Sequence, residues 1–537
     1  MTDTPSIPVQ AEGEKYLADI QAELGANNLG KAMDLAVRAL ADGWRNPLMF
    51  SLASYRLERE GRFLDAADVL AQGLEVYPND LDLLTALGLC LDKSGQSRRA
   101  IAAFDTVLQA VPDFAPAHLG KGTALERLND PDAAERHYRA AVDLMPDFAD
   151  ALGSLAGVLA RRGRHDEARP YAERALAADP ERADARLVLA MSTLMSGAPD
   201  AAEPELRAVV DDPKADPQTR ASAAGALGDA LDAQGRYADA FAAYEDANDR
   251  LRATRSAQSQ AQGETYMALA ERLTAWFASA SDGDWRPDPS TDDMPAAGHA
   301  FIVSAAVRSG ADRLQHMLSA HPGVAMVERN DALEAAEAEY LMTPDGFSRL
   351  AALDAATAKR QRAAYWRRIT VLAGEAKDKV VVDRAPLGAA TLGLIAALFP
   401  KAKIILALRD PRDVVLTSFR RPFLVNPDLN AYLSLDGAVQ LYSASMRLLE
   451  ASWERLPLEI AEMRLEDISD DPGTESRSLA AFLGLDWGPA MGRAAAEAPD
   501  ASMGRNDASR WRNYQSELAP VLPALESWVR RLGYPEA

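Results

Sequence analysis

Three arginines, Arg308, Arg384 and Arg409, each follow a short apolar run of the kind that forms a buried strand. Helical patterns separate these runs, so we expect a parallel α/β sheet whose strands end at one shared edge. Guanidinium groups that meet at that edge would bind a ligand carrying several phosphate-like charges. The alternative interpretation is that the charged run from Arg409 to Asp413 forms surface salt bridges only.

The loop Arg308-Ser309-Gly310 separates the first of these strands, 301–303, from an amphipathic helix around Leu314. The backbone amides of such a loop and the N-terminus of the helix form an anion-binding site. The chain has no GxxxxGK[ST] motif, which excludes the usual Walker loop for nucleoside triphosphates. Its six histidines show no metal-ligand spacing, and we expect no metal.

The first half of the chain has a different organisation, because four columns of residues recur in it with a period of 34. The columns are Pro78, Pro112, Pro146 and Pro180; Gly61, Gly95, Asn129, Gly163 and Gly197; Ala66, Ala100, Ala134, Ala168 and Ala202; and Ser54, Gly88, Gly122, Ala156 and Ala190. The Gly/Asn column predicts a left-handed residue at the end of the first helix of each pair. The small residues let paired helices approach closely, and proline ends the second helix.

Helix, turn, helix and proline within 34 residues resemble the tetratricopeptide repeat. We expect an array of about six to seven helix pairs over residues 13–250, then a helix and an Asp/Pro/Ser-rich linker over 251–298. The resemblance implies an all-α solenoid whose concave groove holds a protein or peptide, with a scaffold or dimerisation device as the alternative. Residues 1–250 carry 42 acidic and 26 basic side chains, a net charge of −16, so the groove would prefer a basic or neutral peptide.

The second half, residues 299–537, resembles the sulfotransferases that use 3′-phosphoadenosine 5′-phosphosulfate (PAPS), especially the tyrosylprotein branch. The resemblance implies an α/β sulfotransferase domain with a parallel sheet and a P-loop-like anion site. The matching segments, in the family's order, are Arg308-Ser309-Gly310, His321-Pro322 with Glu328, Asp383-Arg384-Ala385-Pro386, Arg409 with Thr417 and Arg421, Leu465-Glu466-Asp467-Ile468, Phe482-Leu483-Gly484-Leu485-Asp486-Trp487, and Arg510-Trp511-Arg512-Asn513-Tyr514.

The same resemblance implies the roles of individual residues. The residues that would bind PAPS are Arg308, Ser309, Gly310, Ala311 and Asp312 around the 5′-phosphosulfate, and Arg409, Thr417 and Arg421 around the 3′-phosphate. Glu328 would act as the general base. Arg308 would stabilise charge on the bridging oxygen, and Arg384, which replaces the family's lysine, would stabilise the transferring group.

The 5′-phosphosulfate loop departs from the family pattern, because Ala311 and Asp312 stand where the family has two threonines. Losing two hydroxyl donors to a charged group costs about 1.5–3 kcal/mol each. The carboxylate of Asp312 would also repel the phosphate unless it turns away or serves as the N-cap of the following helix. The segment that would hold the 3′-phosphate, around Arg409 and Thr417, keeps the family pattern.

Composition restricts the remaining possibilities. The net charge of −22 argues against general nucleic-acid binding. The single cysteine, Cys90, permits no intrachain disulfide and fits a reducing compartment. The start of the sequence lacks a secretory signal, and the longest apolar run, 387–399, has 13 residues, too few to span a bilayer. We therefore expect a cytoplasmic protein that binds neither nucleic acid nor membrane.

These observations predict a sulfotransferase that moves a sulfuryl group from PAPS to a hydroxyl, with tyrosine as one candidate, of a protein or peptide captured by the repeats. The alternative is a catalytically degenerate sulfotransferase fold that serves as a repeat-mediated protein-binding module. A different transferase on the same fold is the third possibility. The substitutions Ala311 and Asp312 favour the second hypothesis. The first is favoured by Glu328, Arg409, Thr417 and Arg421.

Overall fold

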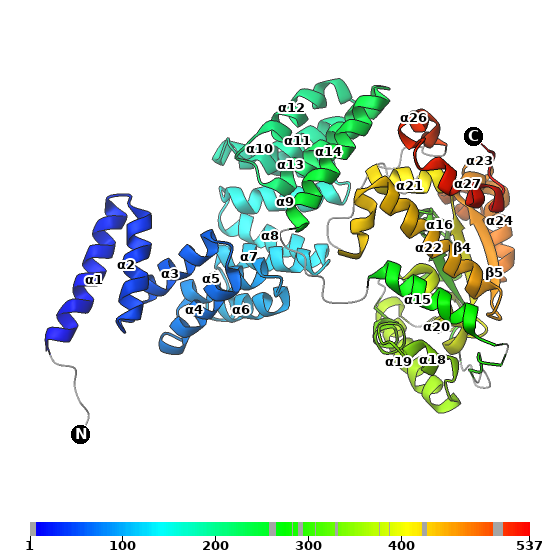
Figure 1. Cartoon of the computed structure of the whole chain (residues 1–537), viewed down its shortest axis with the longest axis horizontal. Coiled ribbons are helices and arrows are strands. Elements are labelled where there is room, and N and C mark those ends of the chain that lie inside the picture. The colour runs from blue at the N-terminus through cyan, green and yellow to red at the C-terminus, as the bar shows by residue number, and fades with distance from the viewer. Residues whose placement is uncertain are drawn as a thin grey trace. The chain divides into compact units, whose positions relative to one another are not determined.

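A computed structural model of the chain describes residues 7–256, 265–281, 283–287, 294–304, 306, 308–327, 331–374, 376–385, 387–420, 427–497 and 509–536 (Figure 1). The chain folds into two compact units, Met1–Ser196 and Gly197–Ala537. The first unit is all helical and the second contains a parallel sheet. The predicted fold class, an all-α repeat array followed by an α/β domain, is confirmed.

The first unit consists of consecutive antiparallel helices joined by short turns. They are α1 (Ile7–Gly25), α2 (Leu29–Ala41), α3 (Pro47–Arg59), α4 (Phe63–Val76), α5 (Leu81–Lys93), α6 (Ser97–Ala110), α7 (Ala115–Arg127), α8 (Pro131–Leu144), α9 (Ala149–Arg161), α10 (His165–Ala178) and α11 (Ala183–Met195). Each predicted helix pair from α3 to α10 is present, and Pro78, Pro112 and Pro146 each follow the end of a second helix.

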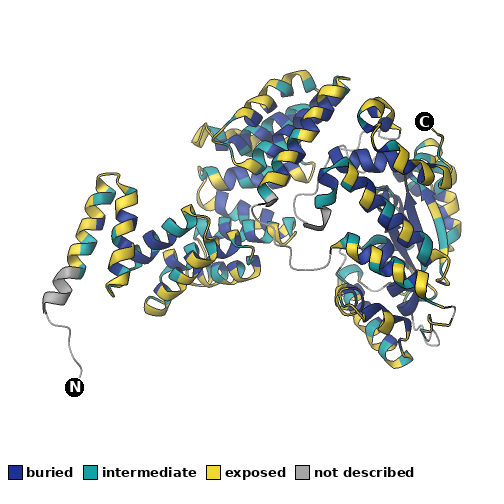
Figure 2. Cartoon of the chain, viewed as in Figure 1, coloured by how far each residue is buried: buried dark blue, intermediate teal, exposed yellow. Residues whose placement is uncertain are grey.

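The periodic columns have the conformations that their residue types predict. All five members of the Gly/Asn column adopt positive φ angles, from 60° at Asn129 to 85° at Gly197. The alanine column from Ala66 to Ala202 is fully buried between paired helices, where Figure 2 shows the buried faces of the repeats. A Cβ atom at Gly88 would lie 2.6 Å from the Phe104 ring, so the close approach of these helices requires glycine.

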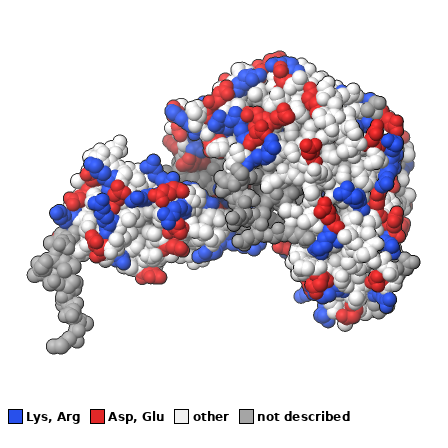
Figure 3. All heavy atoms as spheres, viewed as in Figure 1, with Lys and Arg blue, Asp and Glu red and all other residues white. Residues whose placement is uncertain are grey.

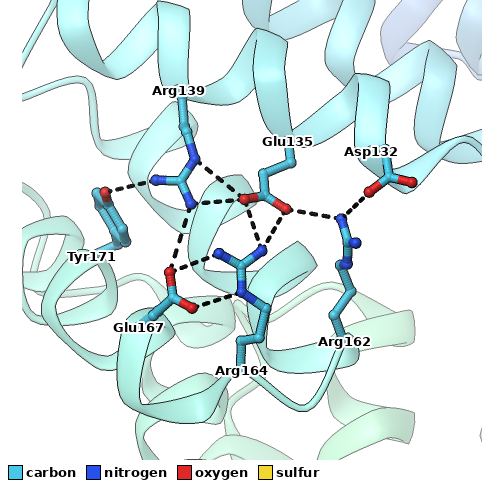
Figure 4. A network of polar contacts seen from close by, with 7 residues as sticks. All are labelled: Asp132, Glu135, Arg139, Arg162, Arg164, Glu167 and Tyr171. Atoms are coloured by element: carbon cyan, nitrogen blue, oxygen red, sulfur yellow. Dashed lines mark hydrogen bonds and ion pairs between the residues drawn. The ribbon is translucent and has the colours of Figure 1, made fainter. Parts of the chain in front are cut away.

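Neighbouring repeats are also joined by an ion-pair network centred on Glu135 of α8 (Figure 4). Glu135 accepts hydrogen bonds from Arg139, Arg162 and Arg164, the last at 2.8 Å. Burial favours a higher pKa for Glu135, but the hydrogen bonds from Arg139 and Arg164 outweigh it and hold the pKa below its usual value. Three arginines and three carboxylates make the network neutral, so it offers no net charge to a ligand.

The second unit begins with helices and continues into the sheet. Its elements are α12 (Pro199–Asp211), α13 (Pro217–Ala233), α14 (Tyr237–Ser256), α15 (Tyr266–Ser279), β1 (Gly298–Ser304), α16 (Ala311–Ser319), β2 (Val324–Met326), α17 (Glu334–Tyr340), α18 (Gly346–Ala351), α19 (Ala355–Ala373), β3 (Val380–Arg384), η1 (Gly388–Thr391), α20 (Leu392–Leu398), β4 (Lys403–Leu408), α21 (Pro411–Arg420), η2 (Pro427–Leu433), α22 (Leu435–Trp453), β5 (Glu459–Arg464), α23 (Leu465–Asp470), α24 (Pro472–Leu483), α25 (Pro489–Ala496), η3 (Arg510–Tyr514), α26 (Gln515–Leu518) and α27 (Leu522–Arg531).

The sheet has five strands in the order β2-β3-β1-β4-β5, and every neighbouring pair is parallel. The three strands predicted from apolar runs are its central strands β1, β3 and β4, which are almost entirely buried. Ile302 and Ile405 pack with Leu314 and Met317 of α16 on one face of the sheet. The sequence did not reveal β2, which has three residues, or β5, a partly exposed edge strand in which three of the six residues are charged.

Candidate functional site

The strand order places the predicted loops at one point of the sheet. The strand β1 lies between β3 and β4, so the strands that follow β1 in the chain lie on both sides of it in the sheet. Ligands bind parallel sheets at such a switch point, outside the carboxyl ends of the strands. Arg308 follows β1, Arg384 is the last residue of β3 and Arg409 follows β4. The structure therefore brings the three predicted arginines to the same edge of the sheet.

The loop after β1 has a specialised backbone. Arg308 has φ +66° and Gly310 has φ +94°, both in the left-handed region. A Cβ at Gly310 would lie 3.1 Å from the side chain of Leu465, so glycine lets the loop pack closely against the start of α23. Gly310 is also the N-cap of α16. The first backbone amides of a helix have no partner four residues earlier in the helix, and such amides can bind an anion. The hydroxyl of Ser309 donates to the carbonyl of Ala306 at 2.7 Å and must rotate before it can donate to a ligand.

Asp312 forms an ion pair with Arg384. The distance between Asp312 Oδ1 and Arg384 Nη1 is 2.5 Å. Helix capping was one of the two alternatives for Asp312, and the structure does not have it, because Gly310 holds the N-cap position and Asp312 lies in the first turn. The carboxylate still lies at the favourable end of the helix dipole. Its pairing with Arg384 places a negative charge between the loop and the arginine expected to stabilise a transferring group.

The residues after β4 are more deeply buried than this loop. Arg409 is 1% exposed, and its Nη1 lies 3.4 Å from the carbonyl oxygen of Arg308. Asp410 forms a buried ion pair with Arg412 at 2.7 Å, and the guanidinium of Arg412 lies 3.8 Å from the centre of the Trp511 ring. Thr417, on the second turn of α21, is 4% exposed. The interpretation of the whole charged run as surface salt bridging is therefore wrong.

Asp413 joins α21 to the C-terminal segment. It is fully buried and accepts hydrogen bonds from the backbone amides of Ser509, at 2.6 Å, and Trp511, at 2.8 Å. Burial raises the pKa of Asp413 to about 7, against the opposing effect of Arg409. The carboxylate thus acts as a remote cap for η3. Glu466 supports the same turn by accepting from the amide of Asp410, at 3.0 Å.

A second buried acidic cluster lies beside β3, and sequence reasoning missed it. Asp383 accepts from the hydroxyl of Tyr365 at 3.0 Å, and this hydroxyl lies 2.9 Å from His299 Nε2. Burial raises the pKa of Asp383 to about 7. Burial, followed by the charge of Asp383, also raises the pKa of Glu337 to about 7. This network fixes the end of β3 from which Arg384 projects, and the aspartate preceding Arg384 was its only signal in the sequence.

Two predicted site residues, Glu328 and Arg421, lie outside the described residues. The others fall into two groups: Arg308 to Asp312 and Arg384 around the loop after β1, and Arg409 with Thr417 around α21. Within the described part of the chain, no three His, Cys, Asp or Glu side chains are grouped as a metal site requires. No helix of the described residues is long and apolar enough to cross a membrane.

Comparison with protein families gives two independent matches. Residues 300–489 match the model of the sulfotransferase family. Residues 52–183 match one tetratricopeptide repeat model in three overlapping stretches, and residues 159–224 match a second. The matches cover the sheet and its loops in one case and the 34-residue periodicity in the other.

Individual similar proteins cover parts of the chain. An uncharacterised protein of Aquifex aeolicus is 24% identical over 168 residues, which are 29% of this chain and 22% of that protein, so the chain spans about a fifth of its curated relative. A solved tetratricopeptide repeat protein of Parabacteroides merdae is 17% identical and covers 44% of this chain and 93% of its own, with a TM-score of 0.35. The repeat protein YrrB, described as having an unusual peptide-binding site, is 22% identical over 34% of this chain and 93% of its own, with a TM-score of 0.28.

Proposed function

We propose that this chain is a sulfotransferase, which transfers a sulfuryl group from PAPS to a hydroxyl of a protein or peptide. The chain joins tetratricopeptide repeats to a sulfotransferase-family domain. The observation that carries the proposal is the convergence of Arg308, Arg384 and Arg409 at the switch point of the sheet. Three guanidinium groups and the amides of a helix N-terminus suit a ligand with phosphate at one end and phosphosulfate at the other.

The residues of the two groups fit the two ends of the donor. Arg409 is held rigidly by burial, and Thr417 follows on the next helix, so these two side chains would bind the 3′-phosphate, with Arg421 added by family resemblance. The backbone of Arg308 to Asp312 would bind the 5′-phosphosulfate. Preformed positions reduce the entropy that binding must overcome.

PAPS and Asp312 compete for Arg384, and the free energies of the two interactions decide which one binds it. The side chains of Arg384 and Asp312 are 35% and 54% exposed. An exposed ion pair contributes at most about 1 kcal/mol. A phosphosulfate oxygen offers Arg384 a charge-assisted hydrogen bond of about 1.5–3 kcal/mol. The donor would therefore displace Asp312 from Arg384, with a moderate loss of affinity.

In the transfer step, the acceptor oxygen attacks sulfur while the bond from sulfur to the 5′-phosphate oxygen breaks, and 3′,5′-adenosine bisphosphate leaves. By family resemblance, Glu328 takes the hydroxyl proton, which is needed because a tyrosine phenol has a pKa of about 10. Arg308 stabilises charge on the leaving oxygen and Arg384 on the transferring group. We expect Glu328→Gln to abolish transfer while nucleotide affinity stays within twofold; full turnover by this variant would remove Glu328 from the mechanism.

The repeats would supply the acceptor. Tetratricopeptide arrays hold extended or helical peptides, and the net charge of −16 over residues 1–250 favours a basic or neutral segment. On the face drawn in Figure 3, basic and acidic side chains are interspersed over the repeats. The absence of disulfide-forming cysteine pairs fits a cytoplasmic location for the reaction.

A second function, a binding module without transfer activity, is favoured by one specific observation. Asp312 neutralises Arg384, and the Ser309 hydroxyl is engaged with the carbonyl of Ala306. Both features reduce the donors available to a phosphosulfate.

Titration calorimetry of the intact chain with 3′,5′-adenosine bisphosphate tests the proposed donor, because this product carries both phosphates and needs no acceptor. We expect saturable binding of one equivalent in the micromolar range, about −8 kcal/mol. A flat titration at millimolar nucleotide would contradict the proposed donor.

A further inference from the structure

The helical hairpin α13–α14 packs directly on elements of the sulfotransferase-family domain. The rings of Phe241 and Phe419 stack with their centres 5.2 Å apart. The amide of Asn248 donates to the carbonyl of Phe419 at 2.9 Å, and Leu251 packs with Leu433. The hairpin therefore contacts the C-terminal end of α21, the helix that carries Thr417.

A cluster of charges is buried in this contact. Asp232 of α13 is 6% exposed and accepts hydrogen bonds from Arg510 and from the hydroxyl of Tyr514. Arg420, 7% exposed, lies 3.4 Å from Asp232 and 3.2 Å from Asp229. Two carboxylates face two guanidinium groups, so the cluster is neutral. Buried charges persist only where each one has partners, which fixes the relative positions of the elements that carry them.

The cluster connects three elements, α13, α21 and η3. The segment η3 is attached to α21 at its start by Asp413, which accepts from the amides of Ser509 and Trp511. At its other end, Tyr514 of η3 is attached to Asp232 of α13. Arg420 lies three residues after Thr417 on α21, so the two side chains project from neighbouring positions of one helical face.

We propose that Asp232 is a positioning residue of the nucleotide site: it holds α21 and η3 in the arrangement that presents Thr417 and Arg409 to the 3′-phosphate. The inference rests on the proposed function for its ligand, while the contacts that carry it lie in α13, α21 and η3. By this account, α13 and α14 help to position the nucleotide-binding residues of the sulfotransferase-family domain.

The direction in which one substitution changes nucleotide affinity distinguishes a positioning role from a purely electrostatic role. Asp232→Asn removes a negative charge near an anion site, so a purely electrostatic role predicts tighter nucleotide binding. Loss of positioning predicts weaker binding, because Arg420 and Arg510 lose a shared acceptor and η3 loses its second attachment. We expect the affinity of the full chain for 3′,5′-adenosine bisphosphate to fall at least tenfold; unchanged or tighter binding would overturn the proposal.

Two tyrosines of the same cluster provide a matched pair of milder variants. Tyr514→Phe removes a hydroxyl bond from η3 to Asp232, whereas Tyr244→Phe removes a hydroxyl bond within the hairpin, from α14 to Asp229. We expect Tyr514→Phe to weaken nucleotide binding about threefold and Tyr244→Phe to change it less than 1.5-fold. Equal effects of the two variants would overturn the proposal even if Asp232→Asn did not fold.

Hydrogen exchange of the full chain without nucleotide separates this proposal from the proposed donor. Asp232→Asn and Tyr514→Phe should speed the exchange of backbone amides at least tenfold in both 411–420 and 509–514, because contacts of Asp232 with α21 and η3 are lost. Faster exchange confined to α13 and α14 would overturn the positioning role. If the wild-type chain binds no nucleotide but both variants exchange faster in 411–420 and 509–514, the proposed donor is contradicted. The connection that Asp232 makes between α21 and η3 is then supported without it.

Discussion

The two halves of the candidate site differ in how firmly the protein holds them. On the α21 side, Arg409 and Thr417 are buried, and the surrounding Asp410–Arg412 pair and Asp413 are all engaged in internal contacts. On the side of the loop after β1, the Asp312–Arg384 pair is about half exposed. The side chains of the first side are fixed by burial and internal contacts before any ligand binds, whereas the second would have to exchange an internal ion pair for its ligand.

This difference indicates where binding energy and control reside. Groups that are fixed before binding contribute most of their interaction to affinity, while groups that must first break internal contacts contribute less. We therefore expect the 3′-phosphate to dominate nucleotide affinity and the 5′ end to be held weakly. Substitutions on the two sides should act in opposite directions.

The largest effect on affinity should come from Arg409→Ala. Its guanidinium is 1% exposed and therefore fixed in position, so we expect affinity for 3′,5′-adenosine bisphosphate to fall at least tenfold, about 1.4 kcal/mol or more. Calorimetry measures the change. Arg409→Lys, which keeps the charge but loses the planar fork, should give an intermediate value. Equal affinity in Arg409→Ala would remove this arginine from the site.

On the other side, the double change Ala311→Thr, Asp312→Thr should tighten binding about tenfold, because it adds hydroxyl donors and frees Arg384. Since Asp312 makes no capping hydrogen bond, the change should lower the melting temperature little. Asp312→Asn is the control that frees Arg384 without adding the threonine hydroxyls, and it should recover part of the gain. A double variant that binds no tighter would favour the binding-module hypothesis.

Removal of Met1–Ser196 should change nucleotide affinity less than twofold, because the second compact unit retains α13, α14 and the whole sheet. The same truncation should raise the apparent KM for a protein acceptor. A truncation at residue 250 is the informative comparison, since it also removes the hairpin attached to α21 and η3. If both truncations bind nucleotide equally well, the hairpin has no part in the site.

The acidic cluster beside β3 should make stability depend on pH. The pKa of Glu337 is raised to about 7 by burial and by Asp383, so the folded state keeps a proton that the unfolded state releases above pH about 4.5. The free energy of unfolding should therefore decrease as pH rises from about 4.5 to about 7 and then level off. Glu337→Gln should remove this part of the dependence and stabilise the domain at pH 8 by about 1–3 kcal/mol, measured by thermal melting. Glu339→Gln, at an exposed position of the same helix, is the control and should change stability by less than about 0.5 kcal/mol.

The sequence predicted those features that follow from local rules. A glycine or asparagine every 34 residues signals a left-handed helix end, and an arginine after an apolar run signals the end of a strand. The sheet order then brought Arg308, Arg384 and Arg409 together as a parallel topology requires.

The sequence failed where partners are far apart in the chain. Asp312 pairs with Arg384, 72 residues away, and Asp232 pairs with Tyr514, 282 residues away. No local pattern encodes such contacts. The alternative in which Asp312 caps the helix is ruled out by a local feature, because the left-handed Gly310 begins the helix two residues before Asp312.

Calorimetric titration of the intact chain with 3′-AMP and with 5′-AMP tests the central claim most directly, because each ligand keeps one phosphate of 3′,5′-adenosine bisphosphate. The account predicts that 3′-AMP binds within about tenfold of the bisphosphate and that 5′-AMP binds at least tenfold more weakly than 3′-AMP, a difference of about 1.4 kcal/mol. Equal affinities, or tighter binding of 5′-AMP, would show that the loop after β1 holds the nucleotide and would contradict the account.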